Sequence, residues 1–475
     1  MQTGPSERWC AVRLVAYGAA AVVALVLAVF VVRFIWQRPQ RGLLLLAALT
    51  PLSGLLVIAP VPGVAAAWKE GLLAVTLVCA FARRGVRRTS PPVHIPYWPA
   101  IVVFVAFGLV SALVVYGPIG LVGAKVTFFY LLVLVVLWWA PFDTRDRDHL
   151  VTVLMVMCVV TCAVGIFQQI VGPARLVQFG YDFGTQVRTS GPLFRTFSTF
   201  NQPFGFGLYV MVGLLVGGAV ALAEPRRRRN RIFLWLAPVM AVVMATSVVR
   251  AAILGLLVGI IWLAVIRFRY LFAPLGALLA MAVAAFPFLP SSTTSVFFSS
   301  SSLGQRGAGW SEIISSILVH PLGRGLGSSG AAADRISTAQ GQSPETVTAS
   351  AGGLTQSTSA NYQPDNYYVK TLLELGPIGL WAFLAVILTA LVWCVQSARR
   401  LPGRDGALAL GVSASIVAAM AASLVATYFE IFPLDLHFWL LLGVVGCATA
   451  QQDSRSARSH SDRAEAVYRP TSASS

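Results

Sequence analysis

Residues 232–266 read IFLWLAPVMAVVMATSVVRAAILGLLVGIIWLAVI, two apolar runs that only Arg250 separates. Each run is close to the roughly 17 to 25 residues with which a helix crosses a bilayer. Similar runs recur near 14–34, 42–60, 64–82, 97–116, 119–140, 150–171, 203–223, 232–249, 251–266, 271–289, 366–394, 407–427 and 433–450. The sequence therefore predicts an all-α polytopic membrane protein with about 12 to 13 transmembrane helices.

The composition of the chain supports this class. Hydrophobic residues make up 57% of the 475 residues, charged residues only 11%, and the mean hydropathy is +0.76. Such values exclude an ordinary soluble enzyme. The formal net charge of +17 raises the alternative of nucleic-acid binding. However, the arginine run at 226–231 lies between two predicted spans and lacks aromatic residues that could stack on bases, so membrane topology explains the charge better and no nucleic-acid partner is expected.

Arginine clusters orient the predicted spans, because short loops rich in Lys and Arg stay in the cytoplasm. Five clusters fall on one side of the membrane: 83–88, 226–231, 267–269, 399–404 and the tail after Arg455. The same alternation puts the loop 172–202, Arg250 and the long polar loop 291–365 on the outer side. Thirteen spans would leave Arg8 and Arg13 outside, so twelve spans with a cytoplasmic N-terminus is the alternative.

Four parts of the chain follow from this interpretation. They are an N-terminal transmembrane bundle of about ten spans over 1–290 with the outer loop 172–202, an extracytoplasmic loop over 291–365, C-terminal transmembrane helices over 366–450, and a disordered cytoplasmic tail over 451–475. The long loop is the place where a membrane protein could handle a polar substrate. Within it, residues 328–363 are expected to be flexible in isolation because they contain few large apolar side chains.

Cations on the predicted outer side oppose the positive-inside trend. They are Lys69, Lys125, Arg195, Arg250 and Arg306. A charged side chain within a membrane costs a few kcal/mol, so such residues usually face a cavity or a partner. Arginine presents a planar fork that binds phosphate oxygens in pairs, which indicates a phosphate or pyrophosphate group as the ligand. For Lys69 and Lys125, snorkelling to lipid headgroups is the alternative.

Two further patterns lie in the long loop. Apolar residues after Arg306 recur at helical spacing and predict an amphipathic helix over 307–320 on the membrane interface. Its N-terminus would offer backbone N–H groups to the anion that Arg306 holds, with a plain packing helix as the alternative. Gly323, Gly325 and Gly327 favour a tight turn over a nucleotide-binding loop, since no strand precedes them.

The six cysteines predict neither a disulfide nor a metal site. Five of them lie in or beside predicted spans and the sixth, Cys10, precedes the first span. Cys158 and Cys162 share a helical face, but no His or carboxylate lies nearby in the sequence to complete a metal site. Packing in the protein core is the favoured interpretation for this pair.

Five strings, in this order and spacing, resemble the O-antigen ligase/polymerase superfamily. They are RTFSTFNQP at 195–203, SVVRAA at 247–252, LGQRGAGW at 303–310, HPLGRGLG at 320–327, and DNYY at 365–368 followed by ELGPIGL at 374–380. The resemblance covers about residues 190 to 380, and the flanking spans agree only in hydropathy. Each string alone is loose, whereas the ordered set is specific.

The resemblance implies a metal-independent, GT-C-like glycosyltransferase that needs no cofactor. In such enzymes an undecaprenyl-diphosphate-linked glycan docks its diphosphate on outer-face arginines, and an acceptor hydroxyl attacks the anomeric carbon. Arg195, Arg250 and Arg306 match the family's arginine positions and would stabilise charge on the departing diphosphate. The catalytic candidates are Asp365, Arg250 and Arg306, and the candidates for binding the diphosphate and glycan are Arg195, Arg250, Arg306, Lys69, Lys125, Asn366, Tyr367 and Glu374.

One position departs from the family pattern. The family's ligases usually carry His where this chain has Asp365, and that His is the expected base. Asp365 could serve as a carboxylate base, orient the acceptor, or pair with an arginine. Glu374 is an intramembrane acid with a structural or acceptor-side role, and Glu70 is expected to pair with Lys69. Further candidates for the base, which no pattern supports, are His320, Glu430, Asp435 and His437.

The leading hypothesis is a polymerase in the cytoplasmic (inner) membrane. It would join lipid-linked repeat units of a surface polysaccharide or exopolysaccharide on the outer face, with the glycan donor, a glycan or other acceptor, the bilayer and polysaccharide assembly machinery as partners. The close alternative is a ligase that moves a finished glycan to another acceptor, although Asp365 in place of His favours the polymerase. From another class, a flippase would show paired halves and midplane charges, whereas here the cations gather on one face.

Overall fold

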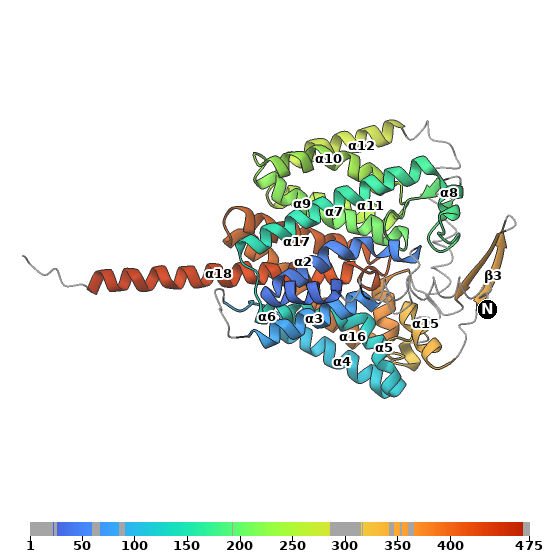
Figure 1. Cartoon of the computed structure of the whole chain (residues 1–475), viewed down its shortest axis with the longest axis horizontal. Helices are drawn as coiled ribbons and strands as arrows, with labels where there is room; N and C mark the ends of the chain where they lie inside the picture. Colours follow the sequence, from blue (N-terminus) through green and yellow to red (C-terminus); the bar gives the residue numbers. More distant parts are fainter. Residues whose placement is uncertain are drawn as a thin grey trace, which may run out of the picture.

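The computed structural model describes residues 22, 26–58, 67–84, 91–191, 193–285, 315, 317–341, 346–351, 354–359 and 365–468. Over these residues the chain is mostly helical (Figure 1). The first half contains a helix over Val26–Gln37, α2 (Gln40–Leu49), η1 (Thr50–Val57), α3 (Trp68–Ala82), α4 (Trp98–Tyr116), η3 (Gly117–Gly120), α5 (Leu121–Phe128), η4 (Phe129–Leu131), α6 (Leu132–Trp139), α7 (Thr144–Val171), α8 (Pro173–Gln178), β1 (Arg188–Ser190), β2 (Leu193–Arg195) and α9 (Pro203–Ala223). The second half contains α10 (Arg228–Ala245), α11 (Arg250–Ile266), η5 (Arg269–Leu271), α12 (Phe272–Ala285), α15 (Gly330–Ala339), β3 (Thr346–Ala351), β4 (Leu354–Ser359), α16 (Tyr367–Arg400), α17 (Gly403–Ala422), η7 (Tyr428–Glu430) and α18 (Leu434–Tyr468).

The prediction of a multi-pass membrane protein is confirmed. Among the described residues, six helical segments are long and apolar enough to cross a bilayer: Trp98–Trp139, Thr144–Val171, Pro203–Ala223, Tyr367–Arg400, Gly403–Ala422 and Leu434–Arg458. Shorter apolar helices, such as Arg250–Ile266, accompany them. The total of about 12 to 13 spans therefore stays a prediction.

Small residues bring the central helices of the bundle together. α9 and α17 pack on each other, and α11 packs on both. A Cβ on Gly255 would lie 2.9 Å from the Ala418 carbonyl oxygen, and a Cβ on Gly411 would lie 2.8 Å from the Val216 Cα. Backbones can approach this closely only where side chains are absent, and such small-residue contacts are the usual way in which helices associate within membranes.

The two ends of the bundle carry different segments (Figure 1). The loop that contains α8, together with α15 and β3, lies at one end, whereas α18 extends beyond the bundle at the other. Sequence analysis predicts disorder from residue 451 onward, but α18 continues as helix to Tyr468. The physical reason is that these residues extend a helix that already exists, so no new helix nucleus has to form.

Two short antiparallel sheets add to the predicted all-α architecture. β1 pairs with β2, and β3 pairs with β4 in a register that sets Thr346 opposite Ser359. The second hairpin and α15 both fall within residues 328–363, which sequence analysis expects to be flexible. β-Branched Thr and Val favour strands, and α15 contains several alanines, so local propensity explains both elements.

The end of the bundle near residue 405 is fixed by a buried arginine on α7. Arg147 is only 2% exposed, and all five of its N–H donors have acceptors. Its guanidinium binds Asp405 in a bidentate pair at 3.1 and 2.8 Å and also donates to Gln451, to Thr144 and to the Phe142 carbonyl. This single side chain therefore ties α7 to α17 and α18.

We expect Arg147→Ala to destabilise the protein strongly. Removing Arg147 leaves the Asp405 carboxylate without its partner and costs about 3 kcal/mol, the low end of the range for a buried pair, because the Asp405 side chain is 23% exposed. The apparent melting temperature of the detergent-solubilised protein measures the effect, and Arg145→Ala, at an exposed position on the same helix turn, is the matched control. Equal melting temperatures for the two variants would contradict this role for Arg147.

Candidate functional site

A short hairpin before α9 sets two arginines against each other. β1 and β2 are antiparallel, with Gly191 in the connection at φ +58° and Arg188 directly opposite Arg195. Like charges that face each other across a strand pair destabilise it. Sequence analysis identifies Arg195 but misses Arg188, which the register of the hairpin brings to the same place.

The segment that follows β2 is tied to the turn between α10 and α11. Arg195 donates from Nε to the Ser247 carbonyl at 3.1 Å, and its guanidinium lies 5.2 Å from the centre of the Phe204 ring. The Thr196 N–H donates to the Thr246 carbonyl at 3.2 Å, and the hydroxyls of these two threonines are 2.7 Å apart. Two motifs that are distant in the sequence therefore form one structural unit.

The α10–α11 turn presents Arg250 at the first residue of a helix. Val248 has φ +53°, a conformation that a β-branched residue rarely adopts. Strained backbone of this kind clusters at functional sites. α11 begins at Arg250 without a side-chain cap, so the exposed guanidinium and the positive end of the helix dipole occupy the same place.

Electrostatics distinguish Arg195 from an ordinary surface arginine. Burial, together with the neighbouring charges of Arg188 and Arg250, lowers the pKa of Arg195 to about 10. Burial also lowers the pKa of Arg188. Within the described part of the chain, neither Arg188 nor Arg195 forms an ion pair. An anion would therefore relieve the cost of burying Arg188 and Arg195, which we call, together with Arg250, the arginine cluster.

In a second group of charged residues, cations and carboxylates are equal in number. Four cations, Lys69, Lys125, Arg335 and Lys370, interact with four carboxylates, Glu70, Glu374, Glu430 and Asp435. Glu70 pairs with Lys125 at 3.2 Å, which corrects the predicted pairing with Lys69. Lys69 instead lies 3.8 Å from the centre of the Phe432 ring, a cation–π contact. The two predicted lysines are therefore gathered in this Lys/Glu cluster rather than beside the arginines.

A break in α16 explains the three alternating glycines. Gly376 has φ +65° and Pro377 lacks an N–H, so the Leu373 carbonyl loses its normal helical donor. The Arg324 N–H donates to that carbonyl at 2.8 Å, and the Gly325 N–H donates to the Glu374 carbonyl at 3.0 Å. Residues 321–330, which we call the strap, thus complete the hydrogen bonds of the broken helix.

Glycines permit the strap to lie against the break. A Cβ on Gly323 would lie 2.3 Å from the Glu374 carbonyl oxygen, and Gly323, Gly325 and Gly327 all have positive φ. This agrees with the predicted tight turn. Both the N–H and the hydroxyl of Ser329 donate to the Glu374 carboxylate, at 3.1 and 3.0 Å. Glu374 also pairs with Lys370 at 2.6 Å, which in turn lies 3.0 Å from Glu430.

The first turn of α16 carries the remaining site candidates. Asp365 is exposed and lies two residues before the first residue of the helix. The Asn366 side chain caps the helix by accepting from the N–H groups of Tyr368 and Val369 at 2.9 and 3.2 Å. Tyr367 is buried, with its ring against Phe383 and Phe429. Of Asp365, Asn366 and Tyr367, only Asp365 is thus exposed.

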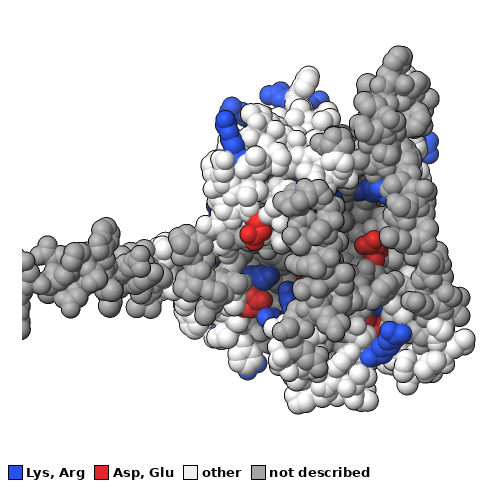
Figure 2. Space-filling model, turned by 90° about the vertical axis from the view of Figure 1, so that its right-hand side faces the viewer, with Lys and Arg blue, Asp and Glu red and all other residues white. Residues whose placement is uncertain are grey.

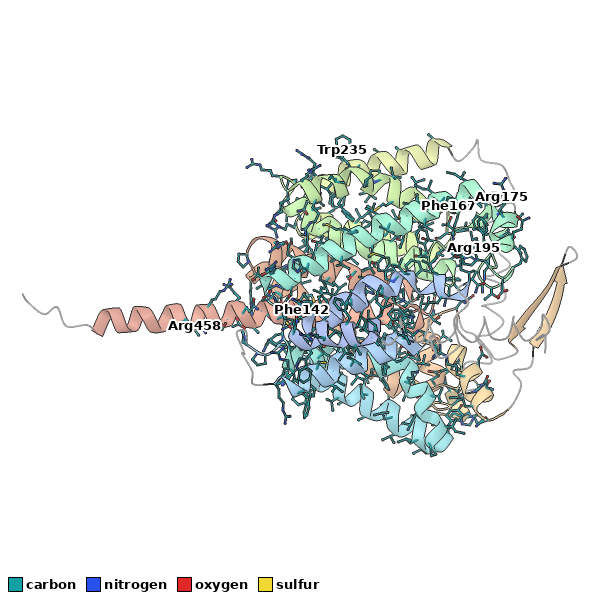
Figure 3. All side chains as sticks on the ribbon, in the orientation of Figure 1. Phe142, Phe167, Arg175, Arg195, Trp235 and Arg458 are labelled. Carbon is teal, nitrogen blue, oxygen red and sulfur yellow. The ribbon has the colours of Figure 1, made fainter. Side chains whose placement is uncertain are left out.

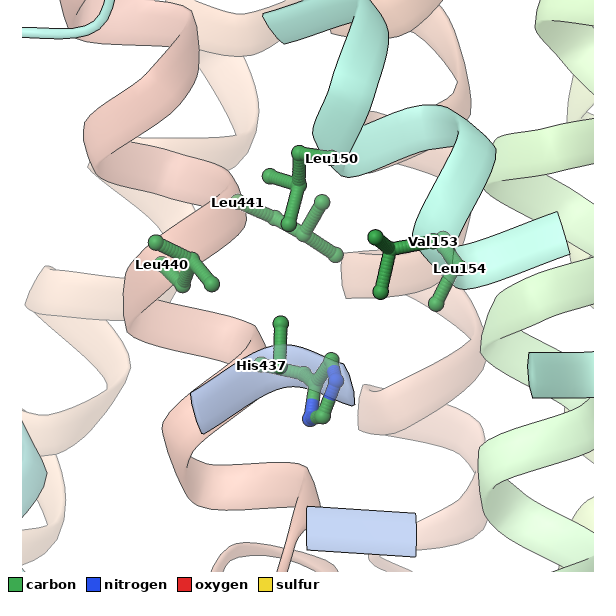
Figure 4. A pocket seen from close by; sticks show the side chains of 7 residues that line it. Leu150, Val153, Leu154, His437, Leu440 and Leu441 are labelled. Atoms are coloured by element: carbon green, nitrogen blue, oxygen red, sulfur yellow. The ribbon is translucent and has the colours of Figure 1, made fainter. Parts of the chain in front are cut away.

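The other candidates for the base differ in accessibility. His437 lies in the core on α18, with Nδ1 2.8 Å from the Pro433 carbonyl, and it borders a tight apolar void lined by Leu150, Val153, Leu154 and other leucines (Figure 4). Glu430 and Asp435 belong to the Lys/Glu cluster, and burial raises the pKa of Glu430. His320 is exposed beside the strap. Arg306 and most of the predicted helix 307–320 lie outside the described residues.

The arginine cluster sits at one end of the molecule. Arg195 and the exposed Arg175 lie at the end opposite Arg458 (Figure 3). Seen from this end, acidic and basic side chains are scattered among the uncharged residues of the described surface (Figure 2). Among the described residues, no group of three or more His, Cys, Asp or Glu side chains could hold a metal ion.

A comparison with protein families identifies part of the chain. Residues 232–384 match the family model for O-antigen ligase. The matched segment contains the strained α10–α11 turn, the strap and the first half of α16. No curated protein matches the chain. The resemblance to the O-antigen ligase/polymerase superfamily is therefore confirmed over residues 232–384, the segment of this multi-pass membrane protein that matches the O-antigen ligase model.

Proposed function

We propose that the protein joins polyprenyl-diphosphate-linked oligosaccharide repeat units into a surface polysaccharide or exopolysaccharide. The transfer takes place on the outer face of the cytoplasmic membrane. One observation carries the proposal: Arg195 is partly buried between two further arginines, and its pKa is depressed. A diphosphate is the ligand that this arrangement suits best, because it offers several charged oxygens to more than one guanidinium.

The contrast between the two charged groups supports this choice of site. In the Lys/Glu cluster each cation has a carboxylate or an aromatic ring beside it. Arg188 and Arg195 contact backbone carbonyls instead. An incoming diphosphate would displace no ion pair of these two arginines. In the Lys/Glu cluster it would have to compete with carboxylates that already occupy the cations.

The proposed reaction uses the diphosphate as the leaving group. The acceptor hydroxyl oxygen forms a bond to the anomeric carbon of the donor, and the bond between that carbon and the diphosphate oxygen breaks. The electron pair leaves with the diphosphate, where Arg195 and Arg250 stabilise the developing charge, with Arg306 as the third proposed contact. The hydroxyl proton passes to Asp365, whose exposed position before α16 permits an acceptor to approach.

The remaining predicted contacts take more limited parts in the proposal. Tyr367 and Glu374 are buried in packing and ion-pair contacts, and Asn366 caps α16. These residues would shape the acceptor side by holding α16. Lys69 and Lys125, in the Lys/Glu cluster, would contribute to the electrostatic potential around the substrate. No cofactor takes part in the proposed reaction.

The polymerase, the ligase and the flippase differ in the acceptor that they use and in the product that they form. A polymerase extends a lipid-linked chain with further repeat units, whereas a ligase transfers a finished glycan to a different acceptor. Both reactions would use the same arginine cluster. A flippase would move the donor across a proteoliposome membrane without forming a glycosidic bond, so product analysis by mass spectrometry separates it from both enzymes.

We expect Arg195→Ala and Arg250→Ala each to lower kcat by about 10²–10³, because each removes a donor that stabilises charge on the leaving group. Chain growth from a lipid-diphosphate oligosaccharide, followed by gel electrophoresis and mass spectrometry with EDTA present, measures the loss. Arg175→Ala, which removes an exposed cation at the same end, should retain wild-type rates. Wild-type chain growth that requires an added divalent metal would sink the metal-independent mechanism.

Asp365→Asn should lower kcat by about 10²–10⁴, the range in which general-base catalysis contributes. The acceptor KM should change little, because the amide keeps the size of the side chain. Asp365→Glu should recover part of the rate, since it restores a carboxylate. Steady-state kinetics with varied acceptor would assign Asp365 to orientation instead if Asn raised the KM and left kcat intact.

A further inference from the structure

Two adjacent glutamines at the end of α7 hold the segment that carries Arg195. Gln168 is 2% exposed, and its side chain forms two hydrogen bonds with one residue, Ser198. Its Nε2 donates to the Ser198 carbonyl at 2.8 Å, and its Oε1 accepts from the Ser198 N–H at 2.7 Å. The Ser198 hydroxyl in turn donates at 2.6 Å to the carbonyl of Thr161, which lies about two turns before Gln168 on the same face of α7.

The double contact holds an unusual backbone conformation. Ser198 has φ +54°, which is uncommon for a residue with a side chain. A glutamine amide carries a donor and an acceptor on one rigid group, so it can satisfy both backbone groups of one residue. A leucine of similar shape would leave both groups buried without partners, which is costly at this depth.

Gln169 acts on the same segment from the next position. Its Nε2 donates to the Phe194 carbonyl at 3.1 Å and to the Thr196 hydroxyl at 2.6 Å. Contacts from α7 thus hold Phe194, Thr196 and Ser198, on both sides of Arg195. The Arg195 side chain extends from this segment to the Ser247 carbonyl and the Phe204 ring.

We propose that Gln168 is a positioning residue for the anion site: it fixes Ser198 and thereby aims the Arg195 guanidinium at the diphosphate. This inference rests on the proposed function, in which the arginine cluster holds that group. Gln168 does not contact the ligand itself. Gln169 supports the same geometry through Phe194 and Thr196.

The test compares two buried glutamines in the full-length protein in nanodiscs. Gln168→Leu removes the contacts to Ser198. Gln451→Leu is the matched control, because Gln451 is also buried and bonded to Arg147 and to the Phe142 carbonyl, near the opposite end of the bundle. Calorimetric titration with inorganic pyrophosphate gives Kd, and hydrogen exchange followed by mass spectrometry reports the order of residues 194–198.

We expect Gln168→Leu to accelerate exchange in residues 194–198 and to raise the pyrophosphate Kd about tenfold, the effect of roughly one lost charged hydrogen bond. Gln451→Leu should lower the melting temperature and leave both readouts at wild-type values. A double variant with Arg195→Ala should bind no more weakly than Arg195→Ala alone, because a residue that acts through Arg195 adds nothing once Arg195 is gone.

Three outcomes would overturn the proposal. Faster exchange with an unchanged Kd would make Gln168 a structural residue only, and additive losses in the double variant would show that it acts independently of Arg195. Failure of the wild type to bind pyrophosphate, with residues 194–198 well protected, would instead remove the anion site and with it the proposed function. The exchange data thus separate the two failures.

Discussion

Backbone polar groups at membrane depth have no water to bind, so they must find partners within the protein. Helices meet this constraint for most of the chain. Where α16 breaks at Gly376 and Pro377, the strap supplies the missing donors from Arg324 and Gly325. Where the chain turns through the strained Ser198, Gln168 supplies both a donor and an acceptor. The irregular segments of the site are therefore built from the hydrogen bonds that replace helical ones.

Charge obeys a related constraint, because a buried cation without a counter-charge is costly. The Lys/Glu cluster solves this internally, with Lys370 between Glu374 and Glu430. The arginine cluster leaves Arg188 and Arg195 without carboxylates in the described part of the structure, and the pKa of Arg195 is correspondingly low. The same physical rule thus yields a structural element in one place and a candidate anion site in another.

Hydropathy alone predicts much of the fold. The run 203–223 coincides with α9, and the run 407–427 overlaps most of α17, because a span must be apolar along its whole length. The sequence does not predict the hairpins because such short strands show little alternation of apolar and polar residues. It does not predict the helix beyond residue 450 because composition does not show that these residues continue an existing helix.

The candidate site is only partly visible in the sequence. Arg195 and Arg250 can be identified because cations are rare on the predicted outer side. Arg188 requires the register of β1 and β2, which pairs residues across a turn. The pairing of Glu70 with Lys125 depends on the packing of different helices, so the neighbouring position of Lys69 in the sequence could not predict it. Gln168 offers one sequence signal, a polar pair with Gln169 at the end of an apolar span.

The central claim is that the arginine cluster binds a lipid-linked diphosphate. The most direct measurement is a cryo-electron microscopy structure of the protein in nanodiscs with a polyprenyl diphosphate bound. The account predicts density for the diphosphate within hydrogen-bonding distance, about 2.7–3.2 Å, of the Arg195 and Arg250 guanidinium groups. Diphosphate density among Lys69, Lys125 and Lys370 instead, with the arginine cluster unchanged, would contradict it.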